Sequence, residues 1–249
     1  MGHLNKDDLH LSRLTVQAQL LQVTPAQSGL LPGQVPQAPQ GLSPEAVARM
    51  YAELVKHGYV SLQQVPGGAQ MASGDGASVL IATANVFQFV EDLTRSAWQV
   101  VVDKLAFTVE RYSHEVAPGA LIVAQIVDLH AVWDNLGRSA DEYVSQRFLK
   151  PGVEKLVEDF GYEFNGSGVR LNLVKDVAPD LPPGVGASGP IRDSVDVRIE
   201  PLLTDKTKLF VQVTGTFAPT RDMREIGKRV SLVHEMTWDR LARSIALEA

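Results

Sequence analysis

The fold is decided by residues 194–249, which read SVDVRIEPLLTDKTKLFVQVTGTFAPTRDMREIGKRVSLVHEMTWDRLARSIALEA. Two segments within this stretch alternate apolar and polar residues, and a polar tip at residues 204–207 separates them. Such alternation predicts a β-hairpin with one apolar and one hydrophilic face. Beyond Pro219 the apolar residues recur every three or four positions, which predicts a helix that packs on the apolar side of the hairpin. These helical positions are Met223, Ile226, Val230, Val233, Leu241 and Ile245.

The remaining chain shows the same kinds of signal. Ser43 and Pro44 are a favourable N-cap and first residue for a helix that ends at Gly58. A second, long helix is expected to begin at Asp92 or Thr94, and a third at Ser139. Alternating segments predict strands at residues 14–23, 59–65 and 120–133, one or two strands within residues 78–90, and a strand pair within residues 162–175. The glycines between residues 67 and 76 predict turns, and the segments 26–40 and 179–190 are rich in Pro and Gly and predict loops.

The order of these elements suggests an α+β protein built from two pseudo-equivalent halves, each with the order strand, helix, several strands, helix. Residues 1–13 would be an N-terminal tail, residues 14–117 the first half and residues 118–249 the second half. This order is similar to the doubled fold of TATA-box-binding proteins. The resemblance implies a curved antiparallel sheet packed on helices, and it implies no activity.

Composition narrows the classes of function. Acidic residues number 29 against 23 basic residues, for a formal net charge of -6, and this balance disfavours a nucleic acid partner held through its phosphates. The chain has no cysteine, which excludes disulfides, thiolate catalysis and cysteine metal sites. No apolar run approaches the ~20 residues that cross a bilayer. We therefore expect a cytoplasmic protein with no cofactor, no metal and no membrane contact.

One pair of residues carries a chemical signal. Asp128 and His130 lie two positions apart in the expected strand 120–133, so that both side chains project from the same face. A carboxylate beside an imidazole fixes the tautomer of the ring and raises its basicity, as a general base or a metal site requires. A long strand can also carry such residues simply where it meets solvent. No nucleophile and no third ligand follows from the spacing.

Neutral polar residues project from the same strands. Their amides and hydroxyls can donate and accept hydrogen bonds without imposing charge. The face that they form is therefore a candidate recognition surface, although a solvated face has the same composition. The candidate binding residues are Gln17, Gln19, Gln212, Thr214 and Thr216.

Three hypotheses follow. The first is a non-catalytic binding or scaffold protein that engages a macromolecule, either a protein partner or a second copy of itself, through the polar sheet face or by self-association. The second is an enzyme or metal-binding protein that uses Asp128 and His130. The third is a saddle for nucleic acid, suggested by the doubled order of elements and disfavoured by the charge. The lack of a complete catalytic set favours the first hypothesis.

Overall fold

A computed structural model describes residues 6–21, 41–134, 136–148, 168–178 and 191–242. Within them, nine strands form a single antiparallel sheet, so the expected α+β class is confirmed. The strands are β1 Leu9–Leu21, β2 Tyr59–Val65, β3 Gly68–Ser73, β4 Ser78–Thr83, β5 Val86–Asp92, β6 Leu121–Trp133, β7 Val169–Asp176, β8 Arg192–Leu202 and β9 Asp205–Phe217. The helices of at least nine residues are α1 Pro44–Leu54, α2 Trp98–Glu115, α3 Ala140–Phe148 and α5 Glu225–Glu235.

The two long strands β1 and β6 pair with each other at the centre of the sheet, whose order is β2-β3-β4-β5-β1-β6-β9-β8-β7. The strands of residues 9–92 therefore lie on one side of the β1–β6 contact and those of residues 169–217 lie on the other. Each central strand carries one unpaired bulge residue, Ser12 in β1 and Val123 in β6. A bulge bends its strand and increases the local twist.

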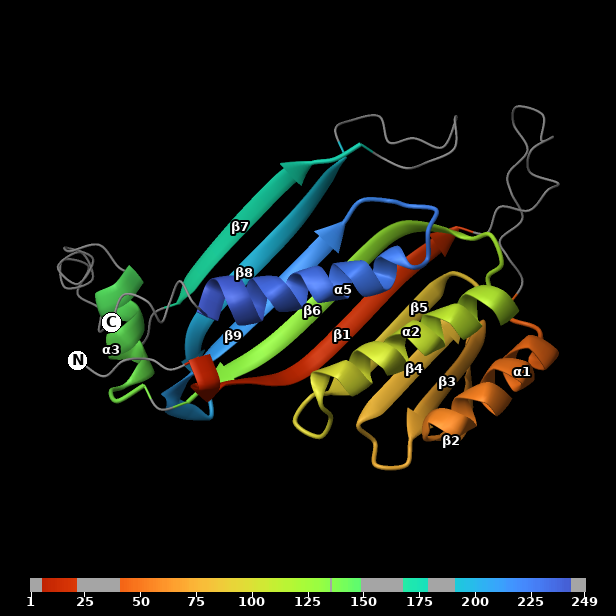
Figure 1. Cartoon of the computed structure of the whole chain (residues 1–249), viewed down its shortest axis with the longest axis horizontal. Helices are drawn as coiled ribbons and strands as arrows, with labels where there is room; N and C mark the ends of the chain where they lie inside the picture. Colours follow the sequence, from red (N-terminus) through yellow and green to blue (C-terminus); the bar gives the residue numbers. More distant parts are fainter. Residues whose placement is uncertain (1–5, 22–40, 135, 149–167, 179–190, 243–249) are drawn as a thin grey trace.

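Helices α1, α2 and α5 lie over one face of the sheet (Figure 1), and α3 packs against β8 and β9. Every second residue of the central strands is fully buried on this helix face, as in Leu14, Val16, Val127 and Leu129. The buried side chains of strands and helices form one continuous hydrophobic core. The opposite side of the sheet, here called the open face, carries the alternating polar residues. Burying apolar surface on one face explains why the strands alternate.

Side chains cap the first residues of two helices, and a third helix begins later than expected. Ser43 Oγ accepts a hydrogen bond from Ala46 N at 3.1 Å, which caps α1 as expected. Ser139 Oγ likewise accepts from Glu142 N at the start of α3. The prediction that Asp92 or Thr94 begins the long helix is wrong, because α2 begins at Trp98. Asp92 instead accepts two hydrogen bonds from Thr94 and closes the loop that precedes the helix.

Several boundaries also differ from the expectation. The first strand begins at Leu9 and not at residue 14, so residues 9–13 extend the sheet instead of forming part of a tail. Residues 68–73 form the strand β3 where only turns were expected. The last helix continues beyond α5 as a π-helical segment, Met236–Leu241. Much of the expected strand pair at 162–175, and Ile245, lie outside the described residues.

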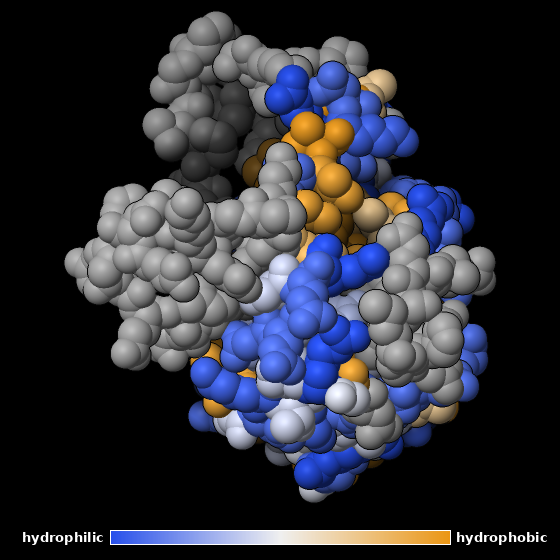
Figure 2. Space-filling model, turned by 90° about the vertical axis from the view of Figure 1, so that its left-hand side faces the viewer, coloured by the Kyte–Doolittle hydropathy of each residue, from blue (hydrophilic) through white to orange (hydrophobic). Residues whose placement is uncertain are grey.

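The sheet ends in an edge strand, β7, that exposes apolar side chains. Leu171, Leu173 and Val174 are 46%, 49% and 59% exposed. Figure 2 shows a hydrophobic strip on this side of the molecule. None of the helices in the described part of the chain is both long enough and apolar enough to span a bilayer.

Candidate functional site

The open face is organised as rows of side chains that run across neighbouring strands, because directly paired residues of antiparallel strands project to the same side. One row contains mostly amides and hydroxyls, with Ile81 and Ile126 between them. Its members are, in order, Gln63, Gln70, Ile81, Gln88, Gln17, Ile126, Thr216 and Ser194. The adjacent row contains Thr15, Asp128, Thr214 and Asp196. The first row is therefore uncharged along its length, and charges lie beside it: Asp128 and Asp196 in the adjacent row, and Arg13 opposite Asp92 on β1 and β5.

Two predicted sets of residues meet in one cluster. Asp128 and His130 on β6 pair directly with Thr214 and Gln212 on β9. Asp128 Oδ1 accepts hydrogen bonds from Gln212 Nε2 at 2.8 Å and from Thr214 Oγ1 at 2.6 Å. Asp128 Oδ2 lies 2.8 Å from His130 Nε2. The candidate catalytic pair and two of the candidate binding residues therefore form a single hydrogen-bonded unit, here called the Asp128 cluster.

The environment of Asp128 favours the ionised carboxylate. Burial alone would raise the pKa of Asp128, but the hydrogen bonds from His130, Thr214 and Gln212 together outweigh it and hold the pKa below the ordinary value. Because the carboxylate can only accept, His130 Nε2 carries the proton in this contact. The ring of His130 also contacts Phe210 edge to face, with 5.1 Å between centroids. The imidazole is therefore held in one orientation.

Within the described residues, the Asp128 cluster is accompanied neither by a group of metal-binding side chains nor by one of the clefts detailed below. The side chains of Asp128 and His130 are 22% and 24% exposed, yet neither residue lines any of the three clefts that are detailed below. No group of three or more His, Asp or Glu residues in the described ranges is placed to hold a metal ion. Gln212 and Thr214 each bring a donor to the carboxylate, as structural partners do. What remains is an oriented surface of donors and acceptors.

The other predicted binding residues lie on the same face. Gln17 is part of the amide row, between Gln88 and Ile126. Thr216 follows Ile126 in that row and is exposed. Gln19 is exposed at the next position of β1, between Val86 and Ala124. All five candidates therefore share the open face, although only Gln212 and Thr214 belong to the Asp128 cluster.

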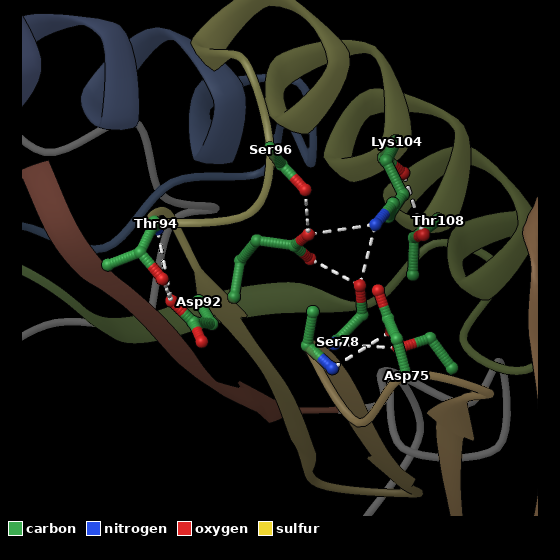
Figure 3. A network of polar contacts seen from close by, with 10 residues as sticks. Asp75, Ser78, Asp92, Thr94, Ser96, Lys104 and Thr108 are labelled. Carbon is green, nitrogen blue, oxygen red and sulfur yellow. Dashed lines mark hydrogen bonds and ion pairs between the residues drawn. The ribbon is translucent and has the colours of Figure 1, made fainter.

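A second polar cluster lies under α2 on the helix face and was not predicted from the sequence (Figure 3). Lys104 Nζ lies 2.8 Å from Glu91 Oε1 and 2.6 Å from Ser78 Oγ, and Ser78 Oγ donates to Glu91 Oε2. Ser96 Oγ also donates to Glu91, at 3.2 Å. A serine beside a lysine can form a nucleophilic dyad, but that chemistry needs a neutral amine. Here the amine of Lys104 is in an ion pair with Glu91, and Ser78 is fully buried.

The cluster around Lys104 therefore ties α2 to the sheet. Its signal in the sequence is faint: Glu91 falls on the apolar phase of β5, after Phe87 and Phe89. A charged residue at a core position needs a partner, and Lys104 lies on the facing helix. The partner could not be chosen before the packing of α2 on β5 was known.

Three clefts are lined by residues that the structure describes. A cleft of about 710 Å³ lies between the end of α2 and the start of α5, with Val109, Ala120, Met223 and Gly227 among its lining. One of about 620 Å³ lies at the other end of these helices. There Trp98 stacks on His234 with 3.9 Å between ring centroids, and His234 is nearly parallel to Trp238, so the three rings pack together. The third cleft lies beside α5 and β9.

Comparison with models of known protein families and with curated proteins finds no match for this chain. Its function is therefore argued from its own geometry.

Proposed function

We propose that this protein is a non-catalytic binding protein that engages a protein partner through the open face of its sheet. The observation that carries the proposal is the row of amides and hydroxyls that crosses the sheet beside the Asp128 cluster. Side chains of this kind recognise a partner through hydrogen bonds, and interspersed aliphatic residues such as Ile81 and Ile126 add apolar contact. Ile126 is 40% exposed at the centre of the face.

The charges of the open face favour protein over nucleic acid. Arg170 and Arg198 project from its last two strands, and each has an acidic partner on the same face. Arg170 Nε lies 3.3 Å from Asp196, and Arg198 Nη2 lies 2.7 Å from Glu200. Cations that are already paired with carboxylates gain less binding free energy from a phosphate backbone, because they release fewer of its counterions. The open face is therefore better suited to a protein partner held by hydrogen bonds and apolar contacts than to a nucleic acid.

The two halves of the chain support a duplicated origin, which we propose as part of this account. Strand order mirrors about the β1–β6 pair. Ser12 accepts a hydrogen bond from Leu93 N in the loop after β5, and Ile122 exchanges two hydrogen bonds with Thr220 in the loop after β9. In each half, hydrogen bonds therefore connect the loop after β5 or β9 to the bulge region of the central strand, β1 or β6. This arrangement supports the TATA-box-binding-protein-like order of elements expected above.

The proposal is tested with a variant that removes the polar groups of the open face, Q17A/Q19A/Q212A/T214A. We expect the purified variant to lose the partner that the wild-type protein captures from native extract. The matched control, Q99A/D103A/E110A/E235A, alters four exposed residues on the helix side and should retain it. Capture by the first variant at wild-type level would overturn the proposal, provided that both variants keep the wild-type circular dichroism spectrum.

The exposed strand β7 favours self-association as a second candidate. Antiparallel pairing of β7 with itself about Asn172 would place Leu171 opposite Leu173 of the other copy, on the same face. Because the chain has no cysteine, N172C should form an intermolecular disulfide under oxidation, whereas Q63C on the other edge strand should not. Monomeric N172C under the same oxidation would refute this pairing.

A further inference from the structure

The cleft beside α5 contains an arginine without a carboxylate partner. Arg229 is half-buried, and its Nη1 and Nη2 donate to Gln125 Oε1 at 3.0 Å and to Ala218 O at 2.7 Å. Its guanidinium lies over the ring of Phe217, 5.2 Å from the centroid. All of these neighbours are neutral. No acidic group of the described residues lies within the 4.0 Å of an ion pair with it, although a buried charge is costly unless it is paired.

In the first half of the chain, Lys104 on α2 has a position similar to that of Arg229 on α5, and it forms an ion pair. Lys104 and Arg229 each lie between buried aliphatic residues, three positions after Val101 or Ile226 and one before Leu105 or Val230. Lys104 meets the carboxylate of Glu91. The residue that corresponds to Glu91 in strand pairing is Phe217: Glu91 pairs with Leu14, two residues beyond the bulge of β1, and Phe217 pairs with Gln125, two beyond the bulge of β6. In the described part of the second half, an uncharged ring therefore takes the position of the Glu91 carboxylate, and Asp193 and Glu225 attract Arg229 only from beyond ion-pair distance.

The acidic groups near Arg229 have other partners. Asp222 forms a two-point ion pair with Arg224, at 2.9 and 3.0 Å. Glu225 forms an ion pair with Lys228. Asp193 accepts a hydrogen bond from Ala218 N at 2.7 Å. Arg229 lines this cleft, and its guanidinium has N–H groups besides the two that donate to Gln125 and Ala218.

That cleft has the size of a small-ligand site. Its volume is about 440 Å³, and its lining combines the apolar residues Val177, Phe217, Pro219 and Leu232 with the cations Lys228 and Arg229 and with three acidic residues. A pocket that combines apolar walls with an oriented charge can bind a ligand with an apolar body and one group of opposite charge. A guanidinium matches the geometry of a carboxylate with two parallel hydrogen bonds. Since Asp193, Asp222 and Glu225 line the same cleft, a single negative charge fits better than a doubly charged phosphate.

We propose that Arg229 anchors the carboxylate of a small monocarboxylic acid, whose apolar body lies against Val177, Pro219 and Leu232. The ligand supplies the anion that Glu91 supplies to Lys104 in the other half. Burial lowers the pKa of Arg229, but a guanidinium stays charged at neutral pH. This site lies on the helix side of the sheet, so it is independent of recognition by the open face.

The test uses hexanoate as the probe and the uncharged hexanamide as its matched control, in millimolar titrations of the full chain followed by amide nuclear magnetic resonance spectra. Hexanoate should shift the resonances of the segments 217–220 and 228–232, and hexanamide should bind at least about tenfold more weakly, because it loses a charge-assisted contact. R229Q should weaken hexanoate binding to a similar degree. R49Q, which alters a 61% exposed arginine of α1, should bind hexanoate as the wild type does.

Equal binding of hexanoate and hexanamide to the wild type would overturn the proposal, as would the absence of shifts with hexanoate. If R229Q does not fold, R229K keeps the charge, and its binding should be intermediate. R229K that binds hexanoate no more tightly than hexanamide supports an anchor that depends on the guanidinium fork. R229K that binds as tightly as wild type contradicts the two-point geometry.

Discussion

The buried pair between Lys104 and Glu91 makes a quantitative prediction about the role of the cluster under α2. Replacing Lys104 with Met leaves the Glu91 carboxylate, whose side chain is 0% exposed, with only the hydroxyls of Ser78 and Ser96. Breaking a buried ion pair in this way costs about 3–5 kcal/mol. Since whole domains are stable by about 5–15 kcal/mol, K104M should lose a large share of its unfolding free energy, and its melting temperature should fall by roughly 6–20 °C.

The double variant E91L/K104M removes both charges and should recover most of that loss, because replacing a buried pair with apolar residues is often neutral or stabilising. Urea unfolding of the wild type, both single variants and the double variant gives the coupling energy. The matched control is K56M, which breaks an exposed pair with Glu53 and should change stability by less than about 1 kcal/mol. A loss below about 1 kcal/mol in K104M, or strictly additive effects in the double variant, would refute the structural role.

Three further predictions concern single positions, each followed by urea unfolding. Because the folded-state pKa of Asp128 lies below the ordinary 3.8, its contribution to the free energy of unfolding is fully present above that value and is lost as pH falls through the folded-state pKa. The advantage of wild type over D128N should therefore shrink as the pH is lowered below 3.8, and a constant difference would contradict it. G68A should lower the free energy of unfolding by at least about 2 kcal/mol, because a Cβ at this position would lie 2.0 Å from Ala82 O. G74A should be tolerated, because the nearest atom to its Cβ would be 3.4 Å away. Equal effects of the two substitutions would refute this reasoning. S43A should lose about 1 kcal/mol by removing the cap of α1, and no loss would show that the cap is dispensable.

The sequence predicts the elements that depend on local patterns. The alternation of β8 and β9 and the apolar spacing of α5 report which face of each element is buried, and Ser43 marks the start of α1. The structure confirms these predictions. The sequence pattern also places the five candidate binding residues on one face, because alternation fixes the face from which each strand residue projects. β3 was missed because Gly68 suggests a turn, although here it allows β4 to approach closely.

What the sequence could not predict depends on contacts between distant segments. The Asp128 cluster joins residues 84 and 86 positions apart, and only the register of β6 with β9 brings them together. The contacts of Arg229 likewise depend on how α5 lies over β6 and β9. The start of α2 was misplaced because Asp92 closes a loop with the same hydrogen bonds that would cap a helix.

The central claim is that the open face of the sheet contacts a protein partner. The most direct measurement is site-specific photo-crosslinking in native extract, with a photoreactive residue placed at position 17, at position 212, or at position 103 on the helix side. The account predicts a crosslinked partner of one common mass from positions 17 and 212 and none from position 103. Crosslinks from position 103 alone, or none from either open-face position, would contradict it.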